Sequence, residues 1–205
     1  MKIYHVSTGL LHVNTYFLVN EETNNAVAID TGERYERIKE IEKNLNITIK
    51  AVLLTHAHFD HAGNVKKLQE DGVKIYISKI DAPKLLNEDN LAKDFGRKFN
   101  YCVADYTFSD GEILDIEGFK IKVLGTPGHT DGSVTFMVDN ALFTGDTLFN
   151  GTVGRTDFPT GDYEQLVLSV RKLFSLDGNY TVYPGHDDFT DLERERKYNL
   201  LAEYD

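Results

Sequence analysis

One ten-residue segment constrains the fold of this chain more than any other part of its sequence. Residues 54–63 read Leu-Thr-His-Ala-His-Phe-Asp-His-Ala-Gly and follow a compact apolar strand predicted at 50–55. Side chains two positions apart in extended backbone point the same way, so His56 and His58 can chelate one ion. Asp60 and His61 follow where the chain turns into a helix, and they can reach a second ion. The segment predicts a metal site at a strand end, with ligands suited to Zn(II), Fe(II) or Mn(II).

Three further residues of metal-ligand type stand at the ends of other predicted strands. His129 lies in Thr-Pro-Gly-His-Thr-Asp, Asp146 in Phe-Thr-Gly-Asp-Thr-Leu, and His186 in Tyr-Pro-Gly-His-Asp. His129 can complete the first site and His186 the second, whereas Asp146, a single carboxylate from the other half of the chain, is suited to bridge both ions. The alternative is that these residues cap and fill the core, which is the usual role of a lone histidine at a strand end.

Strands and helices are predicted from the spacing of apolar residues, with period 2 for strands and 3.6 for helices. The predicted strands lie at 2–6, 14–20, 26–29, 50–55, 74–78, 112–116, 120–124, 133–138, 141–144 and 181–183, and the helices at 33–46, 63–70, 81–86, 163–174 and 192–202. Asp81 is predicted to cap the short helix at 81–86, and segment 87–104 to be irregular. Helices on the outer faces of two stacked sheets would bury every apolar face, which predicts an α/β fold.

Composition and charge exclude several functional classes. The 205 residues include 22 Lys and Arg against 33 Asp and Glu, a net charge of −11, whereas binding nucleic acid or an anionic membrane needs clustered cations. Residues 1–20 contain no uninterrupted apolar segment, so neither a signal peptide nor a membrane span is predicted. The single cysteine, Cys102, lies outside every motif and is predicted to be structural. We therefore expect a cytoplasmic protein without a nucleic-acid or membrane partner, and the sequence leaves a homodimer open.

The motifs resemble those of the metallo-β-lactamase superfamily over nearly the whole chain. Asp30-Thr31-Gly32, the histidine segment, and the three later ligands appear in the order that this family uses. The resemblance implies one domain over 1–205, folded as a four-layer αβ/βα sandwich with a dinuclear site at one edge. It implies that metal 1 binds His56, His58, His129 and Asp146, and that metal 2 binds Asp60, His61, His186 and Asp146. It also implies that Asp30 orients a ligand, although Asp-Thr-Gly is ordinary turn chemistry as well.

Within this superfamily the chain looks like the glyoxalase II group. Thr-Gly-Asp-Thr-Leu-Phe…Val-Gly-Arg-Thr-Asp at 144–157 is similar to that group's segment around the bridging aspartate. The resemblance implies two divalent ions, with Zn(II) favoured and Fe or Mn as alternatives, and hydrolysis of thioesters of the S-D-lactoylglutathione type. A metal-bridging hydroxide is the expected nucleophile, with Asp60 orienting or deprotonating the water and Asp146 bridging the ions. The expected partner is a small-molecule thioester or related substrate.

Departures from the glyoxalase II pattern leave the substrate open. Arg155 matches a basic residue that binds the glycine carboxylate of glutathione, but it can equally pair with Asp157. Asp157 and Asp188 stand where glutathione-specific enzymes have tyrosine, and the sequence is expected to lack their C-terminal helical extension. Gly-Arg-Thr-Asp-Phe at 154–158 is also similar to a segment of persulfide dioxygenases, which use one Fe(II). That dioxygenase, and a lactonase or other ester hydrolase of the same fold, are the alternative functions.

Overall fold

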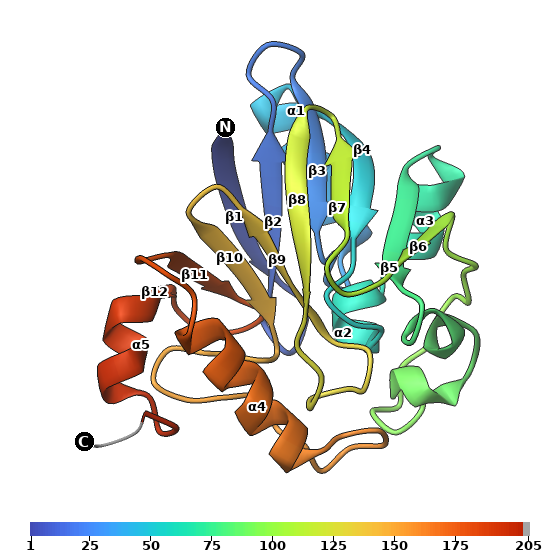
Figure 1. Cartoon of the computed structure of the whole chain (residues 1–205). Coiled ribbons are helices and arrows are strands. Elements are labelled where there is room, and N and C mark those ends of the chain that lie inside the picture. The colour runs from blue at the N-terminus through green and yellow to red at the C-terminus, as the bar shows by residue number, and fades with distance from the viewer. Residues whose placement is uncertain (203–205) are drawn as a thin grey trace.

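Two six-stranded mixed sheets form the centre of the computed structural model, which describes residues 1–202 (Figure 1). The first sheet contains, in spatial order, β1 (Lys2–Thr8), β2 (Val13–Val19), β3 (Asn25–Ile29), β4 (Thr48–Leu53), β5 (Lys74–Ser78) and β6 (Tyr106–Phe108). The second contains β12 (Thr190–Asp191), β11 (Thr181–Pro184), β10 (Ala141–Gly145), β9 (Val134–Val138), β8 (Phe119–Gly125) and β7 (Ile113–Ile116). The pairs β3–β4, β4–β5, β5–β6 and β10–β11 are parallel.

Helices cover the outer face of each sheet. The helices are α1 (Tyr35–Leu45), α2 (Phe59–Ala62), α3 (Val65–Glu70), α4 (Tyr163–Phe174) and α5 (Leu192–Tyr198), with two short 3-10 helices, η1 (Ala82–Leu86) and η2 (Glu88–Asn90). Ile38 of α1 and Leu68 of α3 are fully buried against the first sheet. Val170 of α4 and Leu192 of α5 are buried against the second, on which side Figure 1 shows both helices. Within residues 1–202 no helix is long and apolar enough to cross a membrane.

A third apolar layer fills the space between the two sheets. Tyr16 and Leu53 from the first sheet belong to one buried cluster with Phe136 and Phe143 from the second. The rings of Tyr16 and Phe143 lie edge to face, with their centroids 5.3 Å apart. Because each sheet buries both of its faces, the strands are apolar throughout their central positions. The predicted α/β fold with two stacked sheets between helices, the αβ/βα sandwich, is confirmed.

Several element boundaries differ from the predictions, each for a local reason. The strands β6 and β12 were not predicted, because segments of three and two residues carry no readable period. The predicted helix at 63–70 instead begins at Phe59 and is interrupted at Asn64, whose amide donates to the carbonyls of Thr31 and Gly32. The last helix ends at Tyr198 rather than at 202. Residues 203–205 of the predicted domain lie outside the described residues.

Candidate metal centre

The predicted ligands come together at one edge of the sandwich because the strands that precede them run in the same direction. The loop after β4 carries His56 and His58, and α2 follows it with Asp60 and His61. In the second sheet, the loops after β8, β10 and β11 carry the remaining three, His129, Asp146 and His186. Six of the seven side chains are buried, and His186 is partly buried. The structure therefore brings all seven predicted ligand residues to one place.

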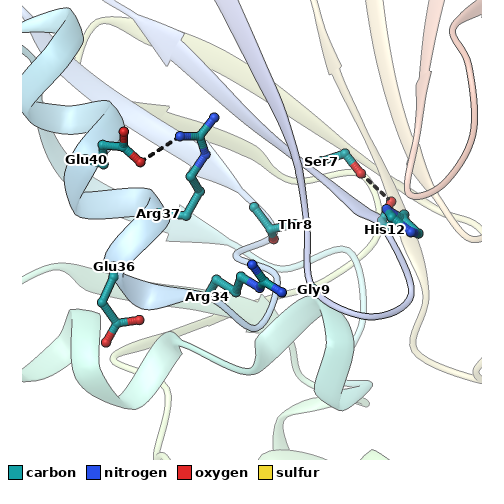
Figure 2. Close-up of a pocket in the computed structure, with 8 residues that line it drawn as sticks. All are labelled: Ser7, Thr8, Gly9, His12, Arg34, Glu36, Arg37 and Glu40. Atoms are coloured by element: carbon teal, nitrogen blue, oxygen red, sulfur yellow. Dashed lines mark hydrogen bonds and ion pairs between the residues drawn. The ribbon is translucent and has the colours of Figure 1, made fainter.

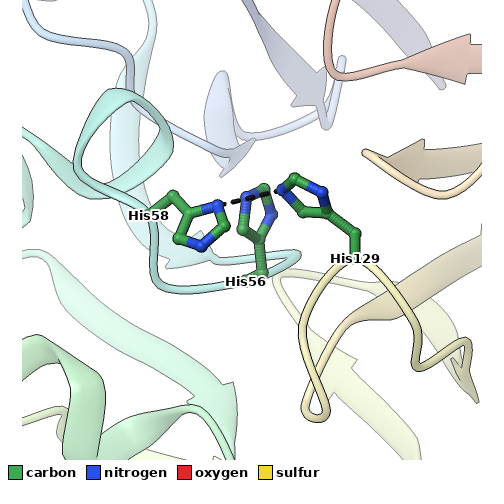
Figure 3. Close-up of side chains that lie close together, drawn as sticks. All are labelled: His56, His58 and His129. Carbon is green, nitrogen blue, oxygen red and sulfur yellow. Dashed lines mark hydrogen bonds between the residues drawn. The ribbon is translucent and has the colours of Figure 1, made fainter. Parts of the chain in front are cut away.

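His56, His58 and His129 form the first ligand group, and Figure 3 shows their three rings turned toward one another. One ring nitrogen from each lies within 4.8 Å of the others. Nδ1 of His58 and Nε2 of His129 are only 2.9 Å apart. Both parts of the chain contribute, since two of the rings follow β4 and the third follows β8. Three imidazoles at this spacing can bind one divalent ion.

Asp60, His61 and His186 form the second ligand group, which includes a carboxylate. Nε2 of His61 lies 3.3 Å from Nε2 of His186, and the latter nitrogen is 3.5 Å from a carboxylate oxygen of Asp60. His186 can approach because Gly185 has no side chain. A Cβ at that position would lie 2.3 Å from Oδ1 of Asp146 and 2.7 Å from Cε1 of His61.

Asp146 lies between the two ligand groups. Its Oδ1 is 3.2 Å from Nε2 of His61, and its Oδ2 is 3.5 Å from Nε2 of both His129 and His186. Among residues 1–202, Oδ1 of Asp146 and Nε2 of His56 find no hydrogen-bond partner although both atoms are buried. Buried polar atoms are rarely left unpaired. These two atoms, with His61, form a third set within 4.8 Å, so the residues present fit a metal ion at this position.

Hydrogen bonds on the outer side of the rings fix which nitrogen faces the centre. Asp30 accepts from the backbone N–H and the hydroxyl of Thr55, and its Oδ2 lies 2.8 Å from Nδ1 of His61. Since the Thr55 hydroxyl donates to Asp30, it accepts from Nδ1 of His56, 3.0 Å away. Both rings thus hold Nδ1 against an outer partner and turn Nε2 toward the centre. The expected orienting role for Asp30 agrees with this geometry.

Two backbone carbonyls orient the rings of His129 and His186 so that Nε2 of each faces the centre. Nδ1 of His129 donates to the carbonyl of Arg155 at 2.8 Å, and Nδ1 of His186 donates to the carbonyl of Leu11 at 2.9 Å. Leu11 belongs to the loop between β1 and β2, so this loop touches the centre even though it carries none of the seven candidate ligands. A donated Nδ1–H is the usual partner of an Nε2 metal ligand.

Burial and charge act differently on the two ligand groups. In the first group, burial lowers the pKa of His58 to about 3. Burial, reinforced by the neighbouring imidazoles, likewise holds the pKa of His56 well below its usual value. In the second group, burial opposes a rise, but the carboxylate of Asp146 outweighs it and raises the pKa of His186 to about 10. For the same reason the pKa of His61 lies well above its usual value.

The two carboxyl groups of the centre stay ionised. Burial alone would raise the pKa of Asp146, yet the imidazoles of His186, His61 and His129 hold it well below its usual value. The pKa of Asp60 is also lowered, because His61 and His186 outweigh its burial. Ionised carboxylates and neutral imidazoles are the forms that bind metal ions, so a metal ion would displace the Nε2 protons of His61 and His186.

Asp81 stands at the predicted N-cap position of η1, but the prediction that its side chain caps this helix was wrong. Its carboxylate makes no bond to the N-terminus of η1. Instead it accepts from the backbone N–H of Ala57, at 2.8 Å, and from the hydroxyl of Thr130. Lys84, itself buried, bridges Asp81 to Asp131. One carboxylate thus links the loop of His56 and His58 to the loop of His129.

Arg155 lies beside the centre, but its guanidinium is engaged. Nε and Nη2 donate to the two carboxylate oxygens of Asp157, each at 2.6 Å. The guanidinium carbon also lies 3.9 Å from the ring centroid of Phe158. Of the two alternatives for Arg155, the local pair with Asp157 is the one that the structure contains.

Cys102 takes no part in the centre. It is buried in the apolar layer between the first sheet and its helices. Its thiol donates to Oε1 of Gln69 at 3.2 Å, and burial raises its pKa to about 11. These properties agree with the predicted structural role.

A cavity of about 140 Å³ opens onto the centre. It is lined by His58, Asp60, His129, Asp146 and His186 together with Leu11, Phe59, Leu91, Phe95, Arg155 and Phe158. A second cavity, of about 510 Å³, lies between α1 and the β1–β2 loop (Figure 2). Its two arginines are Arg34 and Arg37, and Arg37 is paired with Glu40. The smaller cavity is the one that is lined by candidate metal ligands.

A centre of histidines and aspartates at the edge of two stacked sheets defines a class of metal-dependent enzymes. The chain belongs to the metallo-beta-lactamase superfamily, whose family model matches residues 8–186. Hydroxyacylglutathione hydrolase GloC from Haemophilus influenzae is 38% identical over 190 residues, covering 89% of each chain. Membership supports a metal-dependent hydrolase, as predicted.

Two solved structures resemble the chain over almost its whole length. BLEG-1, described as a B3 metallo-beta-lactamase, superposes with a TM-score of 0.93 at 31% identity, covering 98% of this chain and 99% of its own. TTHA1623 in a di-iron-bound form gives a TM-score of 0.86 at 34% identity, covering 96% and 98%. Both comparisons confirm the fold that the motifs predicted.

Proposed function

We propose that the chain is a dinuclear metal-dependent hydrolase that cleaves thioesters of the S-D-lactoylglutathione type. The observation that carries the proposal is the position of Asp146, within 3.5 Å of imidazoles from both ligand groups. One ion would bind the first group and the other ion the second, each sharing this carboxylate. Zn(II) suits the donor set, as do Fe(II) and Mn(II).

The relatives support this assignment from two directions. GloC is a hydroxyacylglutathione hydrolase by name, and its similarity extends over 89% of this chain. TTHA1623 was solved with two irons bound, which supports two ions in a chain of this family. We extend both properties to this chain, acting as a single domain.

The residues of the centre can serve thioester hydrolysis in distinct ways. When bound, the ions supply a nucleophilic water at neutral pH and polarise the carbonyl. Asp60 lines the cavity and stays ionised, so its carboxylate can orient the water and accept its proton. Four of the five imidazoles keep fixed positions because the surrounding chain holds their Nδ1 atoms; these are His56, His61, His129 and His186. No general acid is needed, because a thiol of pKa about 8.5 leaves readily as a thiolate.

The proposal is tested by thiol release from S-D-lactoylglutathione with protein loaded with Zn(II), Fe(II) or Mn(II). Asp146→Ala should lower the rate on the order of a thousandfold, because both ions lose a ligand. The exposed Asp177→Ala serves as the matched control and should keep the rate. Circular dichroism would show that both variants are folded.

Other outcomes would replace the proposal. Oxygen uptake with a persulfide by the iron-loaded protein, without thiol release from any thioester, would establish the dioxygenase instead. Faster hydrolysis of lactones than of thioesters would establish the lactonase.

A further inference from the structure

The cavity over the metal centre has one apolar wall. Its side chains are Leu11, Phe59, Leu91, Phe95 and Phe158. The ring centroids of Phe59 and Phe95 are 5.2 Å apart, and those of Phe95 and Phe158 are 6.0 Å apart. Phe59 and Leu91 are buried in a small apolar cluster of their own, apart from the three large layers of the sandwich. Phe95 is 41% exposed, so one ring of this wall stays accessible to a bound molecule.

Outside the candidate metal ligands, charge recognition in the same cavity depends on one residue. Among the described side chains that line it, Arg155 is the only lysine or arginine. Both donors that face Asp157 are used, and the guanidinium plane rests on Phe158. A substrate carboxylate would have to compete with Asp157 for the Nε–Nη2 side of the guanidinium, or else use the remaining donors on its Nη1 side. The carboxyl of Asp157 stays ionised, since Arg155 lowers its pKa to about 2.

We propose that this cavity selects thioesters whose acyl group is compact, uncharged and apolar. We also propose that it prefers an uncharged thiol to the charged glutathione. The inference rests on the proposed thioester hydrolysis and specifies its substrate class. An apolar cavity of about 150 Å³ holds a benzene ring, and this cavity measures about 140 Å³. Phe59, Phe95 and Phe158 offer ring edges and faces at distances typical of aromatic packing. A phenyl or branched acyl group therefore fits the wall.

The carbonyl of Arg155 connects this selection to the metal centre. It accepts the Nδ1 proton of His129, so the segment that presents Arg155, Asp157 and Phe158 is fixed relative to a candidate ligand. The ring of Phe158 also lies 6.0 Å from that of His58. The aromatic wall is thereby fixed beside the first ligand group.

Four thioesters separate the acyl group from the thiol. Phenylacetyl and D-lactoyl groups are each joined to glutathione and to N-acetylcysteamine, which is uncharged. For the metal-loaded protein we expect kcat/KM to be at least about tenfold higher for phenylacetyl-N-acetylcysteamine than for D-lactoylglutathione. Burying one phenyl group supplies enough binding free energy for a change of about tenfold. The phenylacetyl group should improve both thiol series.

Two variants test the wall and the ion pair. Phe95→Ala should reduce the preference for phenylacetyl over D-lactoyl by about tenfold. Asp157→Asn should free Arg155 and shift the ratio of glutathione to N-acetylcysteamine thioesters toward glutathione by about fivefold. Asp115→Asn is the matched control, since it removes the partner of an exposed lysine, Lys120, on the hairpin of β7 and β8. It should leave both ratios unchanged.

The outcomes distinguish this inference from the proposed function. Equal or faster cleavage of D-lactoylglutathione, or ratios that neither Phe95→Ala nor Asp157→Asn alters, would overturn the selection and leave the thioester hydrolase standing. If no thioester of the four releases thiol while the protein binds two ions, both fall together.

Discussion

Asp30 and Asp81 are two buried carboxylates that support the same metal centre by different contacts. Asp30 touches a candidate ligand directly, since its Oδ2 lies 2.8 Å from Nδ1 of His61. Among the polar partners described for the carboxylate of Asp81 in residues 1–202, none is a candidate ligand. It holds the backbone of Ala57 and the hydroxyl of Thr130, which are chain neighbours of ligands in the two halves of the molecule.

The two carboxylates also differ in the groups that surround them. Asp81 is neutralised by the buried Lys84, which also reaches Asp131. Asp30 has an imidazole and the hydroxyl of Thr55 as its partners and sits in the left-handed region at φ 55°. We infer that Asp30 governs the orientation of ligand rings, whereas Asp81 governs how firmly two loops are joined. Loss of Asp30 should therefore appear mainly in the reaction, and loss of Asp81 mainly in stability.

Of the two supporting carboxylates, Asp30 is expected to have the larger effect on the reaction when it is changed to asparagine. Asparagine tolerates a left-handed backbone. However, one of the two carboxylate oxygens becomes an NH₂ group, which cannot accept a hydrogen bond from Thr55 or His61. Replacing such an outer partner costs about 10- to 100-fold in metal affinity or activity. We expect kcat/KM to fall about 100-fold, measured as thiol release, and metal affinity to fall by a similar factor in a chelator competition. Unchanged values for both would remove Asp30 from the support of the centre.

A smaller effect on the reaction, with a larger effect on stability, is expected for Asp81→Asn. Breaking a buried charged pair from one side costs about 3 kcal/mol, because the partner keeps its charge. Here Lys84 retains Asp131, and Ala57 can still donate to the amide oxygen. The free energy of unfolding, measured by denaturant titration of the metal-free protein, should therefore fall by about 3 kcal/mol, while kcat/KM falls about tenfold.

The double variant Asp81→Asn with Lys84→Met provides the control for this pair. If the two residues act as one unit, its loss of stability should be smaller than the sum of the two single losses, with a coupling of about 1–3 kcal/mol. Simple additivity would contradict the pair.

The same two residues show what the sequence could and could not predict. Asp30 was found because Thr31 and Gly32 follow it in a recognisable order, and the seven candidate ligands were found because each stands next to a predicted strand end. Asp81 precedes Ala82 and Pro83, which is also how a short helix begins, and its partners are 24 and 49 positions away along the chain. Contacts of that range depend on how the two sheets stack, and no local pattern encodes them. The pairing of Arg155 with Asp157 was left open although the two residues are only two positions apart. A carboxylate that close along the chain is an available partner whether or not the arginine has another role.

The smallest effect is expected for Thr130→Val, which probes the weaker half of the Asp81 connection. Valine keeps the shape of the buried side chain but loses the hydroxyl that donates to Asp81 and lies 2.8 Å from Oγ of Ser133. Asp81 keeps Ala57 and Lys84, so the unfolding free energy should fall by only about 1.5 kcal/mol, the value of one hydrogen bond to a charged group. Because His129 is still held by the carbonyl of Arg155, kcat/KM should change less than about threefold, and Thr130→Ser should behave like the parent chain. A loss near 100-fold in Thr130→Val would show that the Asp81 connection positions ligands as strictly as Asp30 does, and the distinction between the two carboxylates would disappear.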